Sequence, residues 1–227
     1  MAHALMLFAA GFGTRMGALT KTRPKPLIEV AGRPLINHAL ALIDAGPVSD
    51  VVINTHYLGR QIADHVAARP RTAISHETPE ILETGGGLQK ALPILGPDPV
   101  FTLNTDAVWT GPNPLDTLAN AWDPSRMEAL LLLVSPEAAF GHTGAGDFYV
   151  DSEERLTRGP GLIYAGTQIL KTERLAARAP GKFSLNEIWN EMLAVGTLFG
   201  VVHAGSWCDV GRPDGIATAE AMLAGAQ

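Results

Sequence analysis

The chain has 227 residues, of which 46% are hydrophobic, and it carries a formal net charge of −6. This length suits one α/β domain with a substantial apolar core, and the lack of a dense basic cluster argues against a nucleic-acid partner. The single cysteine excludes an internal disulfide. Neither a cationic leader nor an apolar run of roughly 20 residues is present, so we expect a cytoplasmic protein without a membrane span.

The first predicted element is a buried strand over residues 5–9, which runs directly into a glycine-rich segment. Gly11 and Gly13 allow a tight turn that brings successive backbone N–H groups close to an anion. Arg15 then offers a planar guanidinium that suits phosphate oxygens, and Lys25, which stands between two prolines, offers a point charge. The segment is therefore predicted to bind a polyphosphate.

Two common phosphate-binding loops do not fit this segment. A dinucleotide fingerprint needs a third glycine three residues after Gly13, where the chain has Met16. A P-loop needs Ser or Thr after Gly-Lys, and Phe183 follows the Gly-Lys pair of this chain. The pattern G-x-G-T-R-M followed by P-K-P-L instead resembles the signature of the sugar-1-phosphate nucleotidyltransferases. One departure is that Gly17-Ala18 stands where many relatives carry Arg-Pro or a similar pair.

The next predicted elements alternate between helix and strand. After a short extended piece, a helix, a strand, a second helix and a second strand are predicted over residues 34–45, 51–54, 58–68 and 72–76. This order predicts parallel strands joined by right-handed crossovers. The resemblance implies the Rossmann-like fold of the nucleotide-diphospho-sugar transferases, a single α/β domain of three αβα layers. Its central sheet is expected to be mostly parallel, with a small antiparallel excursion.

A second glycine-rich segment, LETGGG over residues 82–87, precedes another predicted helix. Consecutive glycines let the backbone approach a flat ring closely. Relatives use an equivalent Leu-Gly-Thr-Ala-type loop to read the nucleotide base, so the resemblance implies that Thr84, Gly85 and Gly86 contact the base. A flexible loop before a helix is the alternative, because triple glycine is common in surface loops.

A carboxylate follows the strand predicted over residues 99–103, in the sequence Asn104-Thr105-Asp106. Open α/β sheets bind ligands outside the carboxyl ends of their strands, so Asp106 is predicted to be a metal ligand beside the phosphate-binding loop. An Asx turn or a helix N-cap is the alternative. The family usually has glycine where Thr105 stands, and a threonine would be strained if the loop needs a left-handed residue there.

The second half of the chain is predicted to form the side of the site that faces the sugar. A helix, a strand and, after a glycine-rich segment, two short strands are predicted over residues 114–122, 128–134, 155–157 and 161–164. Runs as short as the last two indicate an antiparallel excursion over the sheet. The expected sugar contacts are Asn104, Gly146, Asp147, Gly166 and Glu187, of which Gly146 and Asp147 are implied by the resemblance, because the G-D-F element of the N-acetylmuramate 1-phosphate uridylyltransferases contacts the sugar.

Glu187 has two interpretations. Ser184 is the predicted N-cap of a helix over residues 184–195, and a glutamate three residues after the N-cap completes a capping box. The same carboxylate is also a candidate sugar contact. Both interpretations stay open at the level of the sequence.

A further loop follows the strand predicted over residues 198–203. Its Asp209 matches the family's Trp-x-Asp-x-Gly element, whose aspartate completes the metal site. The resemblance therefore implies that Asp106 and Asp209 together hold Mg²⁺. The seven histidines are scattered without a metal-binding spacing, which argues against a zinc site.

The resemblance implies nucleotidyl transfer, in which a sugar 1-phosphate attacks a nucleoside triphosphate and pyrophosphate leaves. The nucleotide phosphates would lie along four residues, Gly11, Phe12, Gly13 and Thr14. Because the attacking phosphate oxygen is already an anion near neutral pH, no general base is required, and the barrier is repulsion between anions. Arg15, Lys25 and Asp106 are the expected catalytic residues. Lys25 would neutralise the α-phosphate and the attacking phosphate, and Arg15 the departing pyrophosphate.

The substrates are expected from four ordered motifs, L-E-T-G-G-G, N-T-D-x-V-W, G-H-x-G-x-G-D-F and W-x-D-V-G. They look closest to the N-acetylmuramate 1-phosphate uridylyltransferases of cell-wall recycling, so UTP and N-acetylmuramate 1-phosphate are the expected pair. Mannose-1-phosphate guanylyltransferases and glucose-1-phosphate thymidylyltransferases share many of these features. The base, the sugar and the number of bound metal ions therefore stay open.

Residues 1–227 are expected to form a single nucleotidyltransferase domain, as a monomer or a homodimer, without the C-terminal left-handed β-helix of bifunctional relatives. A non-catalytic sugar-nucleotide sensor and a nicotinamide-dependent oxidoreductase are the alternatives from other classes. Sensors of this kind usually lose the metal aspartate or the lysine, and this chain retains Lys25, Asp106 and Asp209. The missing third glycine argues against the oxidoreductase.

Overall fold

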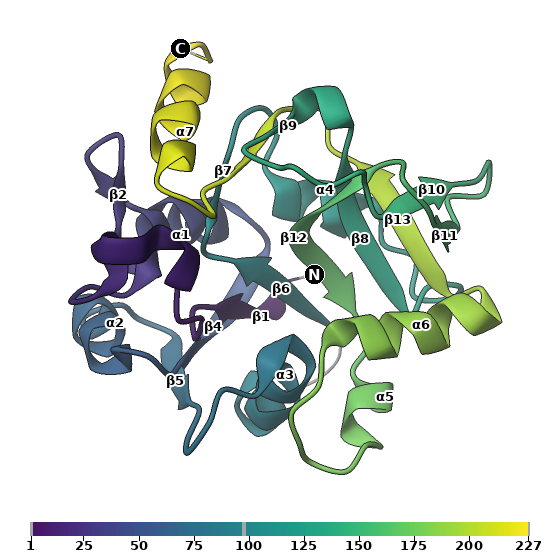
Figure 1. The fold of residues 1–227 in the computed structure, drawn as a ribbon. Helices are drawn as coiled ribbons and strands as arrows, with labels where there is room; N and C mark the ends of the chain where they lie inside the picture. Colours follow the sequence, from purple (N-terminus) through teal and green to yellow (C-terminus); the bar gives the residue numbers. More distant parts are fainter. Residues whose placement is uncertain (1, 97–98, 227) are drawn as a thin grey trace.

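The computed structural model describes residues 2–96 and 99–226. Within these residues, seven strands form a central sheet in the spatial order β13-β8-β12-β6-β1-β4-β5 (Figure 1). The strands are β1 (His3–Phe8), β4 (Val48–Thr55), β5 (Thr72–His76), β6 (Val100–Asn104), β8 (Ala129–Val134), β12 (Ile163–Leu170) and β13 (Leu198–Val202). Of these strands, β12 alone runs antiparallel to its neighbours, so the prediction of a mostly parallel sheet is confirmed.

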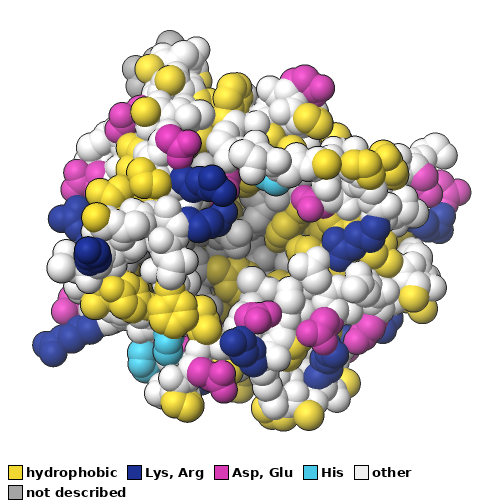
Figure 2. Space-filling view, viewed as in Figure 1, with side chains coloured by type: hydrophobic (Ala, Val, Ile, Leu, Met, Phe, Trp, Pro, Cys, Tyr) yellow, Lys and Arg dark blue, Asp and Glu magenta, His cyan; other side chains and the backbone are white. Residues whose placement is uncertain are grey.

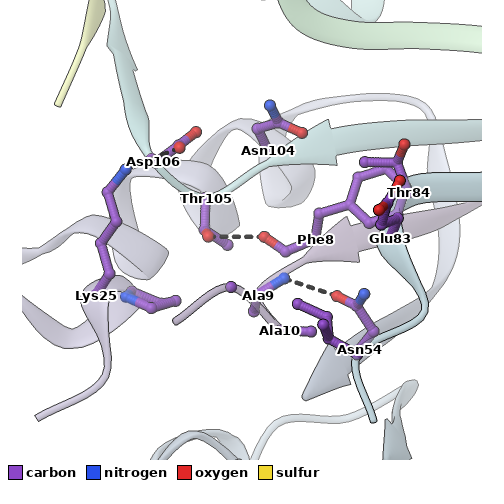
Figure 3. Close-up of a pocket in the computed structure, with 13 residues that line it drawn as sticks. Phe8, Ala9, Ala10, Lys25, Asn54, Glu83, Thr84, Asn104, Thr105 and Asp106 are labelled. Atoms are coloured by element: carbon purple, nitrogen blue, oxygen red, sulfur yellow. Dashed lines mark hydrogen bonds and ion pairs between the residues drawn. The ribbon is translucent and has the colours of Figure 1, made fainter. Parts of the chain in front are cut away.

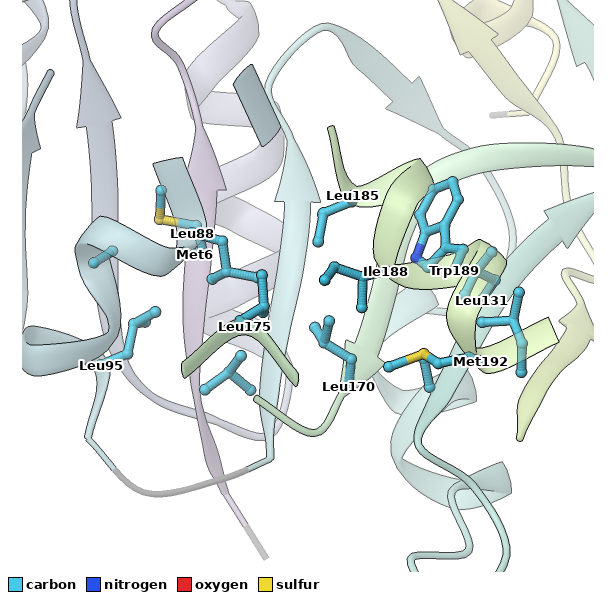
Figure 4. Close-up of a cluster of buried hydrophobic side chains, with 14 of the residues drawn as sticks. Met6, Leu88, Leu95, Leu131, Leu170, Leu175, Leu185, Ile188, Trp189 and Met192 are labelled. Carbon is cyan, nitrogen blue, oxygen red and sulfur yellow. The ribbon is translucent and has the colours of Figure 1, made fainter. Parts of the chain in front are cut away.

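Helices cover both faces of this sheet (Figure 1). One buried apolar cluster contains side chains of α1 (Leu35–Ala45), α2 (Gly59–Val66) and α4 (Pro114–Ala121). The other, drawn in Figure 4, contains side chains of α3 (Glu83–Leu95), α5 (Glu173–Ala176) and α6 (Leu185–Val195). Leu5 and Leu7 of β1 belong to the first cluster and Met6 to the second, because successive strand side chains point to opposite faces. The chain therefore has the predicted three αβα layers.

Among the described residues, three small sheets supplement the central one. β10 (Phe148–Val150) pairs with β11 (Leu156–Arg158), and β2 (Glu29–Val30) pairs with β3 (Arg33–Pro34). The third sheet contains β7 (Ala107–Trp109), β14 (Trp207–Asp209) and β9 (Ala139–Phe140). Pairing of β7 with β14 matters most for the site, because it brings two loops that are far apart in the sequence side by side.

The remaining helices are short or lie at the end of the chain. The 3₁₀ helices in the described part of the chain are η1 (Thr14–Thr20), η2 (Lys25–Leu27) and η3 (Pro136–Ala138). The last helix, α7 (Asp214–Ala224), packs on a separate apolar cluster that includes Met16 of η1 and Cys208 of β14. Within the described residues, none of the helices is both long and apolar enough to cross a membrane.

Two predicted elements differ from the structure. The strand predicted over residues 161–164 is the beginning of the longer β12, which continues into the central sheet because residues 165–170 are buried. Gly166 has a φ of 79° and lies in an irregular stretch of pairing between Tyr164 and Gln168, so a glycine allows the strand to bend there. The glycines over residues 85–87 lie in the first turns of α3 and not in a loop.

Candidate active site

A cavity opens at the carboxyl ends of β1, β4 and β6, which are neighbours in the central sheet (Figure 3). Ligands of open α/β folds bind at this edge of the sheet. Figure 2 shows the region as a hollow with basic side chains on either side. Five of the predicted site residues line the cavity: Gly11, Lys25, Thr84, Asn104 and Asp106.

Lys25 and Asp106 form an ion pair at this cavity, with 2.8 Å between Lys25 Nζ and Asp106 Oδ2 (Figure 3). The residue before Lys25 is extended and Lys25 itself begins η2, so the flanking prolines set the direction of its backbone. Its side chain is 11% exposed. The ammonium is thus held at the end of β6 by a segment that follows β1.

The short β7–β14 ladder places Asp209 beside Asp106. Asp209 lies opposite Ala107 in that ladder, and the N–H of Val210 donates to the carbonyl of Asp106 at 2.8 Å. Burial raises the pKa of Asp209, and the charge of Asp106 raises it further, whereas nearby basic side chains lower it. Two carboxylates from distant parts of the sequence therefore lie near enough for the charge of Asp106 to act on Asp209.

These two carboxylates fit a divalent cation that is shared with a phosphate ligand. Carboxylate oxygens are the donors that Mg²⁺ prefers, and Mg²⁺ usually takes one or two carboxylates together with waters and substrate phosphates. Among the residues that the structure describes, no group of three or more His, Cys, Asp or Glu side chains is arranged to hold a metal ion. Asp106 and Asp209 thus suit a metal site that leaves coordination positions for water and substrate, and not a structural site whose ligands all come from the protein.

Arg15, in η1 directly after the glycine-rich loop, lies near Asp209. A Cβ built on Gly211 would lie 2.8 Å from Asp209 Oδ2 and 3.2 Å from Arg15 Nη2, so the two side chains meet at this glycine. Gly13 has a φ of 64°, and a Cβ there would lie 2.9 Å from Lys25 Cβ. The loop therefore needs a glycine at this position, both for its left-handed turn and for its close approach to Lys25.

Phe12 and Thr14 occupy the outer side of the same loop. Phe12 is 44% exposed, and its ring packs against the rings of His56 and Tyr57. The Tyr57 hydroxyl donates to backbone carbonyl oxygen at the end of η1 at 2.9 Å, so this aromatic cluster supports the loop. Thr14 is exposed at the first residue of η1. Neither residue lines the cavity, and their contact with nucleotide phosphates stays a prediction.

The three residues predicted to contact the base occupy the first turn of α3. The N–H groups of Gly85 and Gly86 both donate to the carbonyl of Phe183, at 2.9 and 3.1 Å. A Cβ on Gly85 would collide with the ring of Phe183, so this glycine allows close packing of two chain segments. Thr84 does line the cavity, and its Oγ1 accepts a hydrogen bond from the N–H of Leu185 at 3.0 Å. Of the three, Thr84 is the residue whose position suits a ligand contact.

A second cavity adjoins the first, and Phe8, Thr84 and Asn104 line both. The second cavity is otherwise lined by Asp147, Phe148, Arg158, Tyr164, Ser184, Leu185, Asn186 and Trp189. Asp147 is anchored there, because its Oδ2 accepts a hydrogen bond from the N–H of Tyr164 at 2.9 Å. This cavity lies on the side of the sheet that was predicted to face the sugar.

Two predicted sugar-contact glycines, Gly146 and Gly166, line neither cavity. Both have positive φ, 98° and 79°. A Cβ on Gly166 would lie 2.7 Å from Asn104 Nδ2, so this glycine makes room for a side chain that lines both cavities. A Cβ on Gly146 would collide with the carbonyl of Gly161, so it permits a close turn. Their effect on a sugar would therefore be indirect.

Glu187 also lies outside both cavity linings. Its Oε2 accepts from Arg178 Nη2 at 2.9 Å, so an arginine that precedes the helix binds the carboxylate. Ser184 is the N-cap of α6 as predicted, but its Oγ accepts from the N–H of Asn186, at 3.2 Å. The predicted capping box is wrong, because an arginine from another segment binds the glutamate.

Comparisons with known proteins agree with this geometry. The family model for the MobA-like NTP transferase domain matches residues 5–153. The chain belongs to the MobA-like NTP transferase family. It is 41% identical to N-acetylmuramate alpha-1-phosphate uridylyltransferase of Caulobacter vibrioides, over 96% of each chain. The protein of the same name from Neisseria meningitidis is 35% identical, over 97% of this chain and 98% of that one.

A solved structure of UDP-glucose pyrophosphorylase complexed with UDP-glucose superposes with a TM-score of 0.78 at 15% identity, over the whole of both chains. This likeness confirms the predicted fold. As a member of the MobA-like NTP transferase family, the chain is a nucleotidyltransferase. Nucleotidyltransferases generally use a divalent metal ion, which agrees with the open pair of carboxylates.

Sequence reasoning missed two buried polar residues of this transferase, Asn54 and Glu77. Asn54 Oδ1 accepts from the N–H of Ala9 at 2.7 Å, where β1 enters the glycine-rich loop (Figure 3). Asn54 Nδ2 donates to Glu77 Oε1, and Glu77 Oε2 accepts from the N–H of Leu82, both at 2.7 Å. A polar residue at the end of β4 was a usable signal for Asn54, but the sequence has no comparable signal for Glu77.

Thr105 of the transferase is not strained. It is not among the residues with positive φ, and its hydroxyl donates to the carbonyl of Phe8 at 2.7 Å. Its N–H donates to the same carbonyl at 3.3 Å. The threonine that replaces the usual glycine therefore ties the end of β6 to the end of β1, beside Asp106.

Proposed function

We propose that this chain transfers UMP from UTP to N-acetylmuramate 1-phosphate, releasing pyrophosphate and forming UDP-N-acetylmuramate. The observation that carries the proposal is that the β7–β14 ladder brings Asp209 beside Asp106, which pairs with Lys25, while Arg15 meets Asp209 at Gly211. The two uridylyltransferases that the chain matches over nearly its whole length support the choice of base and sugar.

In this proposal the nucleoside lies in the first cavity and the sugar lies in the second. Lys25 and Asp106 line the first cavity, so the phosphates would lie toward them. Phe8, Thr84 and Asn104 line both cavities and would sit where nucleotide and sugar phosphate meet. The two ligands then react end to end across the carboxyl edge of the sheet.

Asp106 and Asp209 would hold Mg²⁺, which supplies positive charge to the nucleotide phosphates. The ammonium of Lys25 offers three donors and would neutralise the α-phosphate and the attacking phosphate. Arg15 offers a planar fork to the departing pyrophosphate. Because the sugar phosphate is already an anion, these residues need to offset charge and do not need to remove a proton.

Pyrophosphate release tests the proposal directly. The four common nucleoside triphosphates are each paired with N-acetylmuramate, mannose and glucose 1-phosphates in the presence of Mg²⁺. We expect the pair of UTP and N-acetylmuramate 1-phosphate to turn over fastest. If only the pair of GTP and mannose 1-phosphate turned over, the proposed substrates would be wrong. If no pair released pyrophosphate, a non-catalytic sensor would be favoured.

Lys25→Ala tests the assigned chemistry within the same assay. Loss of one group that stabilises developing charge should lower kcat by about 10²–10³-fold. Lys171→Ala is the matched control, because Lys171 follows β12 at the opposite edge of the sheet and donates to the carbonyl of Pro124. Near-normal turnover of Lys25→Ala would contradict the role proposed for this lysine.

We further propose that residues 1–227 act as a single cytoplasmic domain, as a monomer or a homodimer. The described residues pack around one central sheet, which supports one folding unit. Sedimentation velocity would distinguish monomer from dimer. A second unfolding transition in calorimetry would contradict a single domain.

A further inference from the structure

Arg158 stands at the end of β11 and lines the second cavity, but not the first. Its Nη2 donates to Asn186 Oδ1 at 2.8 Å and to Asn190 Oδ1 at 3.1 Å, so two residues of α6 hold the guanidinium. Its Cζ lies 4.6 Å from the centre of the Phe148 ring and 5.8 Å from that of Trp189. The cation is therefore fixed between aromatic faces and amide oxygens.

Arg158 has no carboxylate partner within the part of the chain that the structure describes. None of the ion pairs between described residues includes it, whereas Arg126, Arg155 and Arg178 all pair with glutamates. The hydrogen bonds to the two asparagines both use Nη2, which leaves Nη1 and Nε for a further acceptor. A guanidinium with free donors in a cavity suits a planar anion such as a carboxylate.

The place of Arg158 separates it from the reacting phosphates. Lys25 and Asp106 line the first cavity only, and Arg158 lines the second only. Figure 2 shows a basic patch bordered by hydrophobic side chains on one side of the hollow, and another basic patch on the opposite side. A ligand group bound to Arg158 therefore belongs to the body of the sugar and not to its 1-phosphate.

We propose that Arg158 binds a carboxylate on the sugar, so that the enzyme selects an acidic sugar 1-phosphate over a neutral one. This inference rests on the proposed nucleotidyl transfer to a sugar 1-phosphate. N-acetylmuramate is N-acetylglucosamine with a lactyl ether, and the carboxylate of that ether distinguishes it from N-acetylglucosamine, mannose and glucose. Arg158 is thus a specificity-determining residue for the sugar.

Asp147 is the other charged side chain in the lining of this cavity. Its charge acts favourably on Arg158, but the two side chains do not form an ion pair. Because Tyr164 N–H binds Asp147 Oδ2, the remaining oxygen can accept from a sugar hydroxyl or amide. Glu187 of α6 is paired with Arg178 and does not line the cavity. The cavity therefore offers a cation to the carboxylate of the sugar and an anchored acceptor to one of its hydroxyl or amide groups.

The test compares N-acetylmuramate 1-phosphate with N-acetylglucosamine 1-phosphate, which lacks only the lactyl group. We expect the wild-type chain to prefer the acidic sugar in kcat/KM. Arg158→Gln should lower kcat/KM for that sugar by about 10- to 100-fold, the loss expected for a charge-assisted hydrogen bond, and leave the neutral sugar nearly unchanged. For the acidic sugar, kcat/KM of Arg158→Lys should lie between the values of the wild type and Arg158→Gln. An ammonium keeps the positive charge but cannot bind a carboxylate with two parallel hydrogen bonds.

Arg126→Gln is the matched control, because Arg126 also lies over an aromatic ring, 4.7 Å from the centre of Phe199, and lines neither cavity. It should leave the preference between the two sugars unchanged. An equal loss for both sugars in Arg158→Gln would assign Arg158 a structural role and overturn the inference. So would a wild-type chain that uses both sugars equally well. Those outcomes leave the proposed function standing, whereas a wild-type chain that releases no pyrophosphate with any sugar overturns both.

Discussion

Asp209 carries a negative charge in an unfavourable place for one. Burial raises its pKa first, and the charge of Asp106 raises it further, against the favourable effects of Lys25 and Arg15. Like charges disfavour one another, so the charge of Asp106 opposes ionisation of Asp209 unless a cation offsets it. At the scale of single residues, the repulsion between these two carboxylates therefore destabilises the metal-free protein and favours the binding of a cation.

Asp209→Asn should raise the thermal stability of the metal-free chain at about pH 8, because it removes a charge that the folded state disfavours. The folded pKa of Asp209 lies above its unfolded value. The wild type therefore loses stability as the pH rises from the unfolded pKa of Asp209 to its folded pKa. Above the folded pKa, the destabilisation by the charged side chain is complete. A gain of about 1 kcal/mol would raise Tm by about 2–4 °C in a chain of this size.

Calorimetry with a chelator, from about pH 4 to 8, checks this expectation. The difference between the two proteins should shrink as the pH falls and vanish below the unfolded pKa of about 3.9, where the wild-type side chain is neutral in both states. Activity should fall sharply in the variant. A variant that is less stable than the wild type at the upper end of the range would contradict the inferred repulsion.

Gly211→Ala should impair catalysis without unfolding the chain. Its Cβ would lie 2.8 Å from Asp209 Oδ2 and 3.2 Å from Arg15 Nη2. Both atoms end flexible side chains that can move away, so the fold survives, but a displacement of about 1 Å in an active site can cost about 10²-fold in rate. Gly181→Ala is the control, because a Cβ there meets nothing within 4 Å. Equal kcat values for the two variants would count against a precise arrangement at Gly211.

At the scale of elements, the two walls of the first cavity are coupled by a buried polar chain. Asn54 at the end of β4 binds the backbone where β1 ends, and Glu77 after β5 binds both Asn54 and the residue before α3. Glu77 is fully buried. A Cβ on Gly87 of α3 would lie 2.6 Å from Glu77 Oε1, so the helix packs directly on this carboxylate.

Glu77→Gln should destabilise the chain by about 1–3 kcal/mol, because one of the two donors that now bind the carboxylate would face an amide NH₂. The same change should raise KM for the nucleotide, since both walls of its proposed cavity shift. Urea unfolding and steady-state kinetics measure the two effects. Glu80→Gln, on the exposed part of the same loop, is the matched control. Equal stability of the two variants would show that the buried network contributes little.

At the scale of the whole molecule, the site depends on a small apolar cluster outside the two main ones. Cys208 is fully buried in this cluster, together with Met16 of η1 and Ala219 of α7. It directly precedes Asp209, and η1 contains Arg15. Packing of the last helix is thus coupled to the position of both charged groups.

Cys208 should resist thiol reagents in the folded chain. Burial raises the pKa of its thiol to about 11, and the charge of Asp209 adds to this, so little thiolate is present at about pH 8. Mg²⁺ with UTP should slow labelling further, because binding opposes the opening of this region. Labelling kinetics with a chromogenic disulfide measure the rate, and urea-unfolded chain is the control. Labelling of the native chain at the unfolded rate would show that the cluster is not closed.

Much of the fold could be predicted from local patterns. Short apolar runs predicted β1, β4, β6 and β8, because the apolar residues of a buried strand are visible in its own sequence. The position of Asp106 followed from the end of such a strand. The extent of β12 was wrong, because burial of residues 165–170 depends on neighbours that the sequence does not show.

The sequence by itself determined the residue types of the site: two glycines, two cations and a carboxylate that follow strands. The tertiary structure alone decided which side chains meet. Gly85 and Gly86 pack on Phe183, Glu187 pairs with Arg178, and Arg158 enters the second cavity. The physical reason is range: strand and turn preferences arise within a few residues, whereas a hydrogen bond or an ion pair needs two atoms within about 3–4 Å, whatever their separation along the chain.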